Sequence, residues 1–107
     1  MIALAETFRA LGDPVRLQMV QRLADGLPST IGAVSSDLGL TRQGARRHLQ
    51  VLVDANMVRL EPKGRDVYVQ LDPAALDLAK SFIAELELRW DRRLAALQRF
   101  VEDDAGP

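Results

Sequence analysis

Cysteine is absent from the 107-residue sequence, and histidine occurs once, as His48. The absence of cysteine excludes disulfide bonds and thiol redox chemistry, and one histidine is too few for the usual zinc sites. No hydrophobic run approaches the roughly 18 residues that favour a membrane span, and the first residues lack the basic stretch of a secretory signal. We therefore expect a cytoplasmic protein with no membrane partner and no bound metal or other cofactor.

The net charge of −1 is also small, but it hides an uneven distribution along the chain. Residues 39–66 carry six basic and three acidic side chains, whereas residues 1–38 and 67–107 have net charges of −1 and −3. A basic segment between acidic flanks can mark a surface that binds a polyanion, and a chance excess on a solvated face is the alternative. With 48% hydrophobic residues, the chain can bury a core, and we expect residues 1–107 to form one domain.

Helical periodicity and capping residues predict four helices in the first half of the chain. Asp13, Thr30 and Thr41 are expected to cap the second, third and fourth helices, and Asn56 is expected to end the fourth in the left-handed conformation. The third helix is expected to continue to Gly39. The fourth helix, over about residues 42–55, has an apolar face and a face rich in arginine.

After this helix the period changes to two, which predicts an antiparallel hairpin over about residues 57–71 with its turn at residues 62–65. A long helix over about residues 73–102 follows. Its apolar side chains recur every three or four residues along a single seam. A helix of about 40 Å exceeds what a domain of about 13 Å radius of gyration can cover, so we expect the seam to pair with a second copy. The seam consists of Leu76, Ala79, Ile83, Leu86, Trp90, Leu94, Leu97 and Val101.

The third and fourth helices form a helix-turn-helix pattern, in which the second helix enters the major groove of DNA. Arg42, Gln43 and Arg46 lie near its start, and arginine and glutamine can read guanine and adenine through paired hydrogen bonds. The basic hairpin that follows is typical of a wing. An ordinary surface helix with three arginines is the alternative. We predict that phosphate and wing contacts come from Thr41, Gly44, Arg47, Lys63, Arg65 and Tyr68.

Three segments in this order resemble the ArsR (arsenic-repressor) type of winged-helix transcriptional regulator. Residues 8–16 (FRALGDPVR) are similar to the opening "ALGDPTR" stretch of the family, residues 38–52 to its recognition segment, and residues 64–72 (GRDVYVQLD) to its wing. The resemblance implies a bacterial homodimer held by the first and last helices, including Phe8, that binds a pseudo-palindromic operator and usually represses transcription. The expected fold is mostly α (α+β): four helices, a two-stranded hairpin wing and a C-terminal dimerisation helix.

Members of this family that sense metals through thiolates carry cysteine on the third helix, where this chain has Thr30 and Gly32. Zinc- and nickel-type members combine Asp, His and Glu on the last helix, which here has Asp77, Glu85, Glu87 and Asp91 but no histidine. These acids are expected to be a solvated helix face, with a carboxylate site for Mg or Ca as the alternative. The resemblance therefore implies a metal-independent member. The sequence leaves open whether the protein binds a small-molecule effector, which is unidentified. A winged-helix module that dimerises or binds proteins without binding DNA is the alternative function, and we expect no enzyme, because no catalytic constellation is present.

Four side chains have expected roles that are wholly or partly structural. His48 is expected to pack and to form hydrogen bonds, and Arg16 is expected to pair with a nearby acid. Trp90 is expected in packing or at the dimer seam, with ligand stacking as the alternative. Tyr68 is expected either to donate to a phosphate or to pack on the recognition helix.

Overall fold

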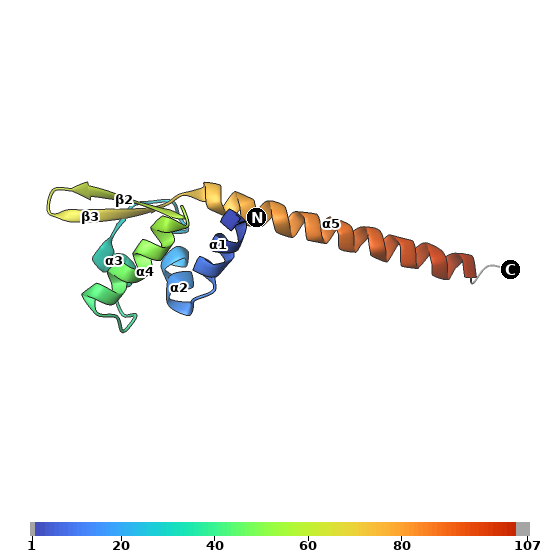
Figure 1. Cartoon of the computed structure of the whole chain (residues 1–107), viewed down its shortest axis with the longest axis horizontal. Helices are drawn as coiled ribbons and strands as arrows, with labels where there is room; N and C mark the ends of the chain where they lie inside the picture. Colours follow the sequence, from blue (N-terminus) through green and yellow to red (C-terminus); the bar gives the residue numbers. More distant parts are fainter. Residues whose placement is uncertain (1, 105–107) are drawn as a thin grey trace.

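The computed structural model describes residues 2–104, which form a mostly helical domain with a small antiparallel sheet (Figure 1). The predicted succession of four helices, a hairpin and a long last helix is confirmed. In chain order the elements are α1 (Ile2–Leu11), α2 (Pro14–Arg22), β1 (Ser29–Thr30), α3 (Ile31–Ser35), α4 (Arg42–Asp54), β2 (Val58–Lys63), β3 (Asp66–Leu71) and α5 (Pro73–Asp104).

The helix boundaries follow from side-chain caps that the sequence predicts. Oδ1 of Asp13 accepts hydrogen bonds from the first-turn backbone N–H groups of α2, at 2.8 and 3.2 Å. Thr30 and Thr41 cap α3 and α4 in the same way, each accepting from the backbone N–H three residues on. Asn56, with φ of 59°, follows the end of α4 in the left-handed region. These caps satisfy N–H groups that a helix start leaves without partners.

The third helix is shorter than the sequence predicts. α3 ends at Ser35 rather than near Gly39, because Asp37 and Gly39 adopt left-handed φ values of 61° and 70° and interrupt the helix. Arg22 of α2 supports this early end. Its Nη1 donates to the carbonyl oxygens of Val34 (3.0 Å) and Ser36 (2.6 Å), which α3 leaves without helical partners. The segment before α4 is thus held by an arginine from another helix.

The sheet contains one strand more than the expected hairpin. Its order is β1-β3-β2, and β1 pairs antiparallel with β3 through Ser29 opposite Val69 and Thr30 opposite Tyr68. The hairpin turn is also tighter than expected, since Lys63 and Asp66 still pair and only residues 64–65 turn. The predicted turn residue Pro62 lies inside β2. This strand is at the edge of the sheet, where a missing N–H costs no ladder hydrogen bond.

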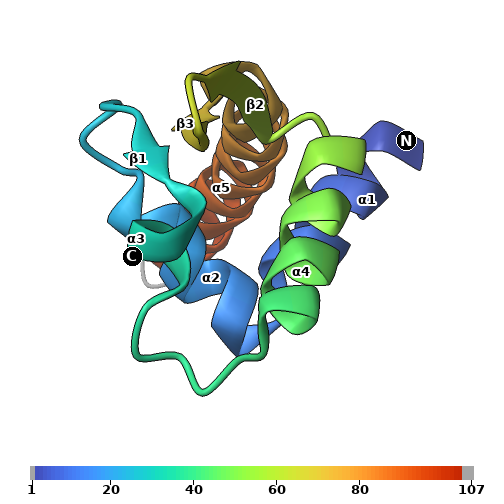
Figure 2. The ribbon, with the colours of Figure 1, turned by 90° about the vertical axis from the view of Figure 1, so that its left-hand side faces the viewer.

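The hydrophobic core lies between the helices and the inner face of the sheet. Figure 2 shows α1, α2, α3 and α4 grouped around this centre, with α5 running away behind them. Leu49 and Leu52 anchor α4, and Val69 contributes from the sheet. The largest fully buried side chains are Met19, Leu23, Val34, Leu49, Leu52, Met57, Val69 and Thr7.

The last helix extends far beyond this core. α5 contains 32 residues, and the molecule measures 76 × 25 × 25 Å with a radius of gyration of 20.0 Å. A compact chain of this length has a radius of gyration of only about 13 Å. In Figure 1 only the start of α5 lies against α1, and the remainder projects away from the domain, opposite the hairpin. The helix reaches Asp104, past the predicted residue 102, and residues 105–107 lie outside the described residues.

Candidate nucleic-acid interface

Helix α4 separates its apolar and charged side chains onto two faces. Ala45, Leu49 and Leu52 are buried against the core, as predicted. The side chains offered to solvent at the start of the helix are Arg42, Gln43, Arg46 and Arg47. Burial of the apolar face therefore fixes the direction in which the predicted base-reading side chains point.

The first turn of α4 depends on Thr41 and Gly44. The backbone N–H of Gly44 donates to Oγ1 of Thr41 at 3.0 Å. A Cβ on residue 44 would lie only 3.2 Å from that same hydroxyl oxygen, a tighter approach than ordinary contacts allow. Glycine at this position thus accommodates the cap. The predicted contact of this backbone with a phosphate stays a prediction.

The arginines of α4 and the two cations at the hairpin tip are free of ion pairs within the described residues 2–104. The ion pairs found there involve Arg16, Arg59 and Arg89, together with His48. Five cations of α4 and the hairpin tip have no carboxylate partner within 4 Å in the described part of the chain, namely Arg42, Arg46, Arg47, Lys63 and Arg65. Unpaired cations are available to neutralise phosphate groups without first breaking a contact in the protein.

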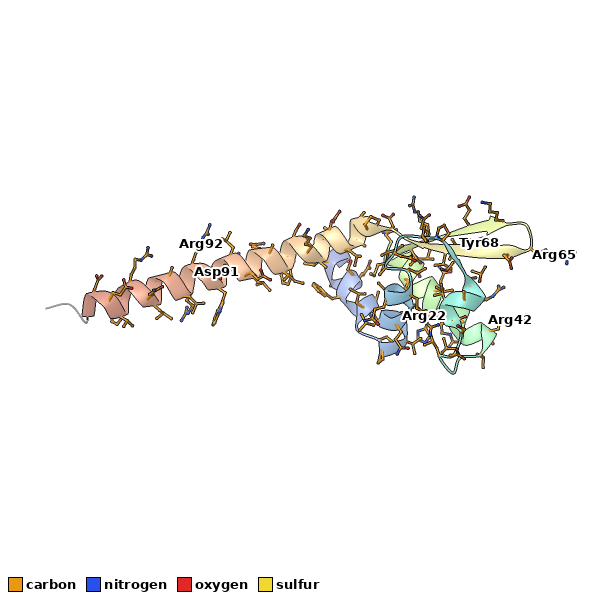
Figure 3. The ribbon with its side chains drawn as sticks, turned by 180° about the vertical axis from the view of Figure 1, so that it is seen from behind. Arg22, Arg42, Arg65, Tyr68, Asp91 and Arg92 are labelled. Carbon is orange, nitrogen blue, oxygen red and sulfur yellow. The ribbon has the colours of Figure 1, made fainter. Side chains whose placement is uncertain are left out.

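The hairpin brings a distant arginine close to α4. A cavity of about 380 Å³ lies between α3, the start of α4 and the hairpin tip, and Arg42, Arg46 and Arg65 all line it. Asp66 lies at its edge and reduces the local positive charge. Figure 3 shows Arg42 and Arg65 at the same end of the molecule, the end opposite the projecting part of α5. The structure therefore places two of the three predicted base-reading residues, Arg42 and Arg46, around the same cavity as the predicted wing contact Arg65.

Hydroxyl groups from α3 line the same cavity and were missed by the sequence analysis as site residues. The hydroxyl groups belong to Thr30, which caps α3, and to Ser35 at its end, and Gly32 lines the cavity between them. The sequence signal available for them was their place on the first helix of the helix-turn-helix pattern. Arg22, which holds the end of α3, carried no sequence signal, because its carbonyl partners lie 12 and 14 residues along the chain.

Tyr68 lies on the sheet face that points away from α4. Its cross-strand partner is Glu61, and the alternation of β3 places the buried Val69 on the opposite face. Tyr68 lines a hollow of about 250 Å³ with Pro28, Arg59 and Gln70 among others. The expectation that Tyr68 packs on α4 is therefore wrong. Its contact with a phosphate stays a prediction.

Arg16 and His48 meet behind the arginine-rich face, as part of the internal hydrogen-bond network. Arg16 lies 4.0 Å from Asp13, in agreement with the expected pairing to an acid, and 3.2 Å from Nδ1 of His48. The pKa of the Asp13 carboxyl is lowered, chiefly by the hydrogen bond from the backbone N–H of Arg16. Desolvation raises this pKa, but the N–H of Val15 and the charge of Arg16 lower it further. His48 is half-buried and forms hydrogen bonds, as expected.

The predicted seam of α5 is largely exposed. Between 45% and 62% of each side chain is accessible at Ile83, Leu86, Trp90, Leu94, Leu97 and Val101. Ala79 is already buried, and Leu76 packs partly against the core. Both nevertheless border a shallow groove of about 440 Å³ along α5 that continues to Ile83. The ring of Phe8 packs edge-on against Phe82 of the same chain at 5.8 Å and is 38% exposed, so it contributes to the α1–α5 contact within the protomer.

Across residues 2–104, the side chains of His, Cys, Asp and Glu do not gather in groups of three or more that could hold a metal ion. Within the same range, none of the helices combines the length and the apolar character needed to cross a bilayer.

Comparison with known proteins agrees with this geometry. A family model described as a helix-turn-helix domain matches residues 11–61, which run from the end of α1 into β2. The HTH-type transcriptional regulator Rv2034 of Mycobacterium tuberculosis is 32% identical over 97 residues, which cover 91% of this chain and 87% of the relative.

Solved structures show the same architecture. An ArsR-like transcriptional regulator from Rhodococcus sp. RHA1 is 26% identical, with a TM-score of 0.75 over 92% of both chains. The homodimeric winged helix-turn-helix DNA-binding domain of Mb0332 from Mycobacterium bovis, a possible ArsR-family regulator, is 27% identical. Its TM-score is 0.61 over 86% of this chain and 82% of that one. The winged helix-turn-helix fold expected from the sequence is confirmed.

Proposed function

Because this chain belongs to the ArsR-type family of winged helix-turn-helix transcriptional regulators, we propose that it is a homodimeric, cytoplasmic repressor of bacterial transcription. Each protomer binds one half of a pseudo-palindromic DNA operator through α4 and the β2–β3 wing. The two copies of α4 enter major grooves on the same face of the DNA, separated by a whole number of helical turns of about 34 Å. No metal or other cofactor takes part, and the chain has no enzymatic activity.

The observation that carries this proposal is the set of five unpaired cations on α4 and the wing. Arg42, Gln43 and Arg46 project from the start of α4, where a helix in the major groove meets base edges, and they read the sequence. Arg47, Lys63 and Arg65 contact phosphates, together with Thr41, Gly44 and Tyr68. Division of the interface into base contacts and phosphate contacts explains why both an exposed polar helix and a basic hairpin are needed.

The exposed seam of α5 supports a second copy of the chain as the partner in the dimer. Residues 77–87 of this helix carry a net charge of −2, and residues 89–99 a net charge of +3. Antiparallel pairing places each acidic part beside the basic part of the partner, whereas parallel pairing places like charges together. Figure 3 shows Asp91 and Arg92 on the projecting part of α5, beyond reach of their own domain.

The absence of cysteine makes this orientation simple to test by cross-linking single-cysteine variants. In an antiparallel pair, cysteine forms a disulfide with its own copy only near the twofold axis, as at Leu86 or Trp90. A parallel pair would also cross-link strongly at Leu76 and Val101, and that result would contradict the antiparallel arrangement.

Selection of bound duplexes from a random pool is the main test of DNA binding. We expect enrichment of an inverted repeat whose half-sites are a whole number of helical turns apart. Binding is then measured by fluorescence anisotropy at low and high salt, with a scrambled duplex of equal length as the control. Failure to enrich any sequence, with no binding at low salt, would favour the alternative function of a dimerising or protein-binding module.

A further inference from the structure

One guanidinium group joins the end of α1 to the middle of α4. Nε of Arg16 donates to the carbonyl oxygen of Ala10 at 2.8 Å, and Nη2 donates to that of Arg9 at 3.3 Å. These carbonyls belong to the last turn of α1. Nη1 of the same side chain lies 3.2 Å from Nδ1 of His48, which is on α4. Arg16 therefore connects a helix that packs against α5 to the helix that carries the base-reading side chains.

The chemistry of this contact determines which nitrogen of His48 carries the proton. A guanidinium offers only N–H donors, so Nδ1 must accept the hydrogen bond. His48 is then neutral, with its proton on Nε2. Protonation of Nδ1 would place two N–H groups face to face at 3.2 Å and would break the connection.

The other charged groups around His48 do not restore this connection. Oδ1 of Asp13 lies 4.0 Å from Nδ1, but that oxygen already accepts two backbone N–H groups at the start of α2. Glu6, Arg9 and Asp54 line the adjoining cavity of about 360 Å³, together with Arg16 itself. A protonated His48 would turn towards Asp13 and away from the bond that reaches α1.

We propose that Arg16 and His48 are positioning residues for DNA recognition, and that neutral His48 holds α4 at the angle needed to read bases. This inference rests on the proposed DNA-binding function. Paired hydrogen bonds from arginine or glutamine to a base edge require a fixed geometry, whereas flexible contacts to phosphates tolerate a small tilt of the helix. Loss of the Arg16–His48 bond therefore lowers the preference for the operator over other DNA more than it lowers binding as a whole.

Two amide substitutions separate this role from a general effect on folding. In His48→Asn the side-chain oxygen can occupy the place of Nδ1, whereas in His48→Gln it reaches the place of Nε2. The measured quantity is the ratio of dissociation constants for the scrambled duplex and the selected operator at pH 7.5. We expect His48→Gln to lower this ratio about three- to tenfold, the effect of one hydrogen bond, and His48→Asn to retain it.

Arg16→Lys provides the partner variant. A single ammonium cannot reach both α1 carbonyls and His48, so the ratio is expected to fall as in His48→Gln. The double variant Arg16→Lys/His48→Gln should lower the ratio no further than either single change, because both remove the same connection.

The pH dependence supplies a readout that a purely structural role would not change. His48 is the only histidine of the chain, so a pH effect that disappears in His48→Asn can be attributed to it. The ratio for the unmodified protein should fall as the pH is lowered from 7.5 to 5.5, while that of His48→Asn stays constant. Added positive charge alone would strengthen binding to both duplexes and leave the ratio unchanged.

The possible results are distinguishable. Circular dichroism and thermal unfolding first establish that each variant is folded. If folded His48→Gln and Arg16→Lys keep the ratio of the unmodified protein, the positioning role is refuted. If His48→Gln does not fold, the pH dependence of the unmodified protein decides. A ratio of dissociation constants that stays the same between pH 7.5 and 5.5 would then refute the positioning role. If the unmodified protein binds neither duplex, the proposed function itself has failed.

Discussion

Replacement of Leu97 by alanine should weaken the proposed dimer about thirtyfold. Leu97 lies on the seam of α5 and is 51% exposed. Complete burial of a leucine side chain is worth about 1.5–3 kcal/mol, so covering the exposed half adds about 1 kcal/mol in each protomer. A symmetric dimer loses this contribution twice, and about 2 kcal/mol corresponds to a thirtyfold increase in the dimer dissociation constant.

Leu88 provides a closely matched control on the same helix. It is 49% exposed, and its separation of nine residues from Leu97 places it on the opposite face of a helix with 3.6 residues per turn. Leu88→Ala should therefore leave the dimer dissociation constant nearly unchanged. Both changes shorten a leucine at similar exposure, so helix propensity and surface hydrophobicity are balanced between them.

Sedimentation equilibrium measures the dissociation constant of each variant directly. The single tryptophan, Trp90, gives a second measurement, because its emission should shift to the red when dilution exposes it to water. Equal weakening by Leu97→Ala and Leu88→Ala would refute the assignment of the seam as the dimer contact, as would an unchanged Trp90 emission across the dissociation range.

Three further predictions concern the DNA interface and α2. Arg46→Ala should cost about 1–3 kcal/mol on the operator and relax selectivity at one base position, and equal losses on operator and scrambled DNA would contradict base reading. Lys63→Ala should weaken binding to all sequences alike and reduce the slope of log K against log salt by about one per protomer, which anisotropy at several salt concentrations will measure. Asp13 has a lowered pKa in the folded chain, so it stabilises the fold above the ordinary pKa of aspartate and loses this effect as the pH falls below it. Asp13→Asn keeps a capping side chain but removes the charge, so its melting temperature should be below that of the unmodified protein at neutral pH, with a difference that shrinks towards pH 2.

Local interactions explain which parts of this fold could be predicted from the sequence. The starts of α2, α3 and α4 depend on hydrogen bonds between residues two or three positions apart, so Asp13, Thr30 and Thr41 reveal them directly. The separation of arginines and leucines on α4 follows equally from helical periodicity. Both features determine where the candidate interface lies.

Features that depend on distant parts of the chain were not predictable in this way. Strand β1 contains two residues, and it exists because Ser29 and Thr30 pair with β3 almost 40 residues later. Arg22 supports the early end of α3 from another helix, and Arg16 connects α1 to α4. The sequence predicts that Arg16 pairs with an acid, but the backbone carbonyls that Arg16 and Arg22 contact are visible only in the structure.

The projecting half of α5 has a consequence for how the dimer assembles. Residues 89–104 lie beyond α1, and an isolated helix of this length is only marginally stable in water. Order in this segment therefore depends on the helix that pairs with it, and helix formation and association become one coupled reaction. Helical content should then rise with protein concentration, and the heat-capacity change of dimerisation should exceed that expected for docking two rigid surfaces.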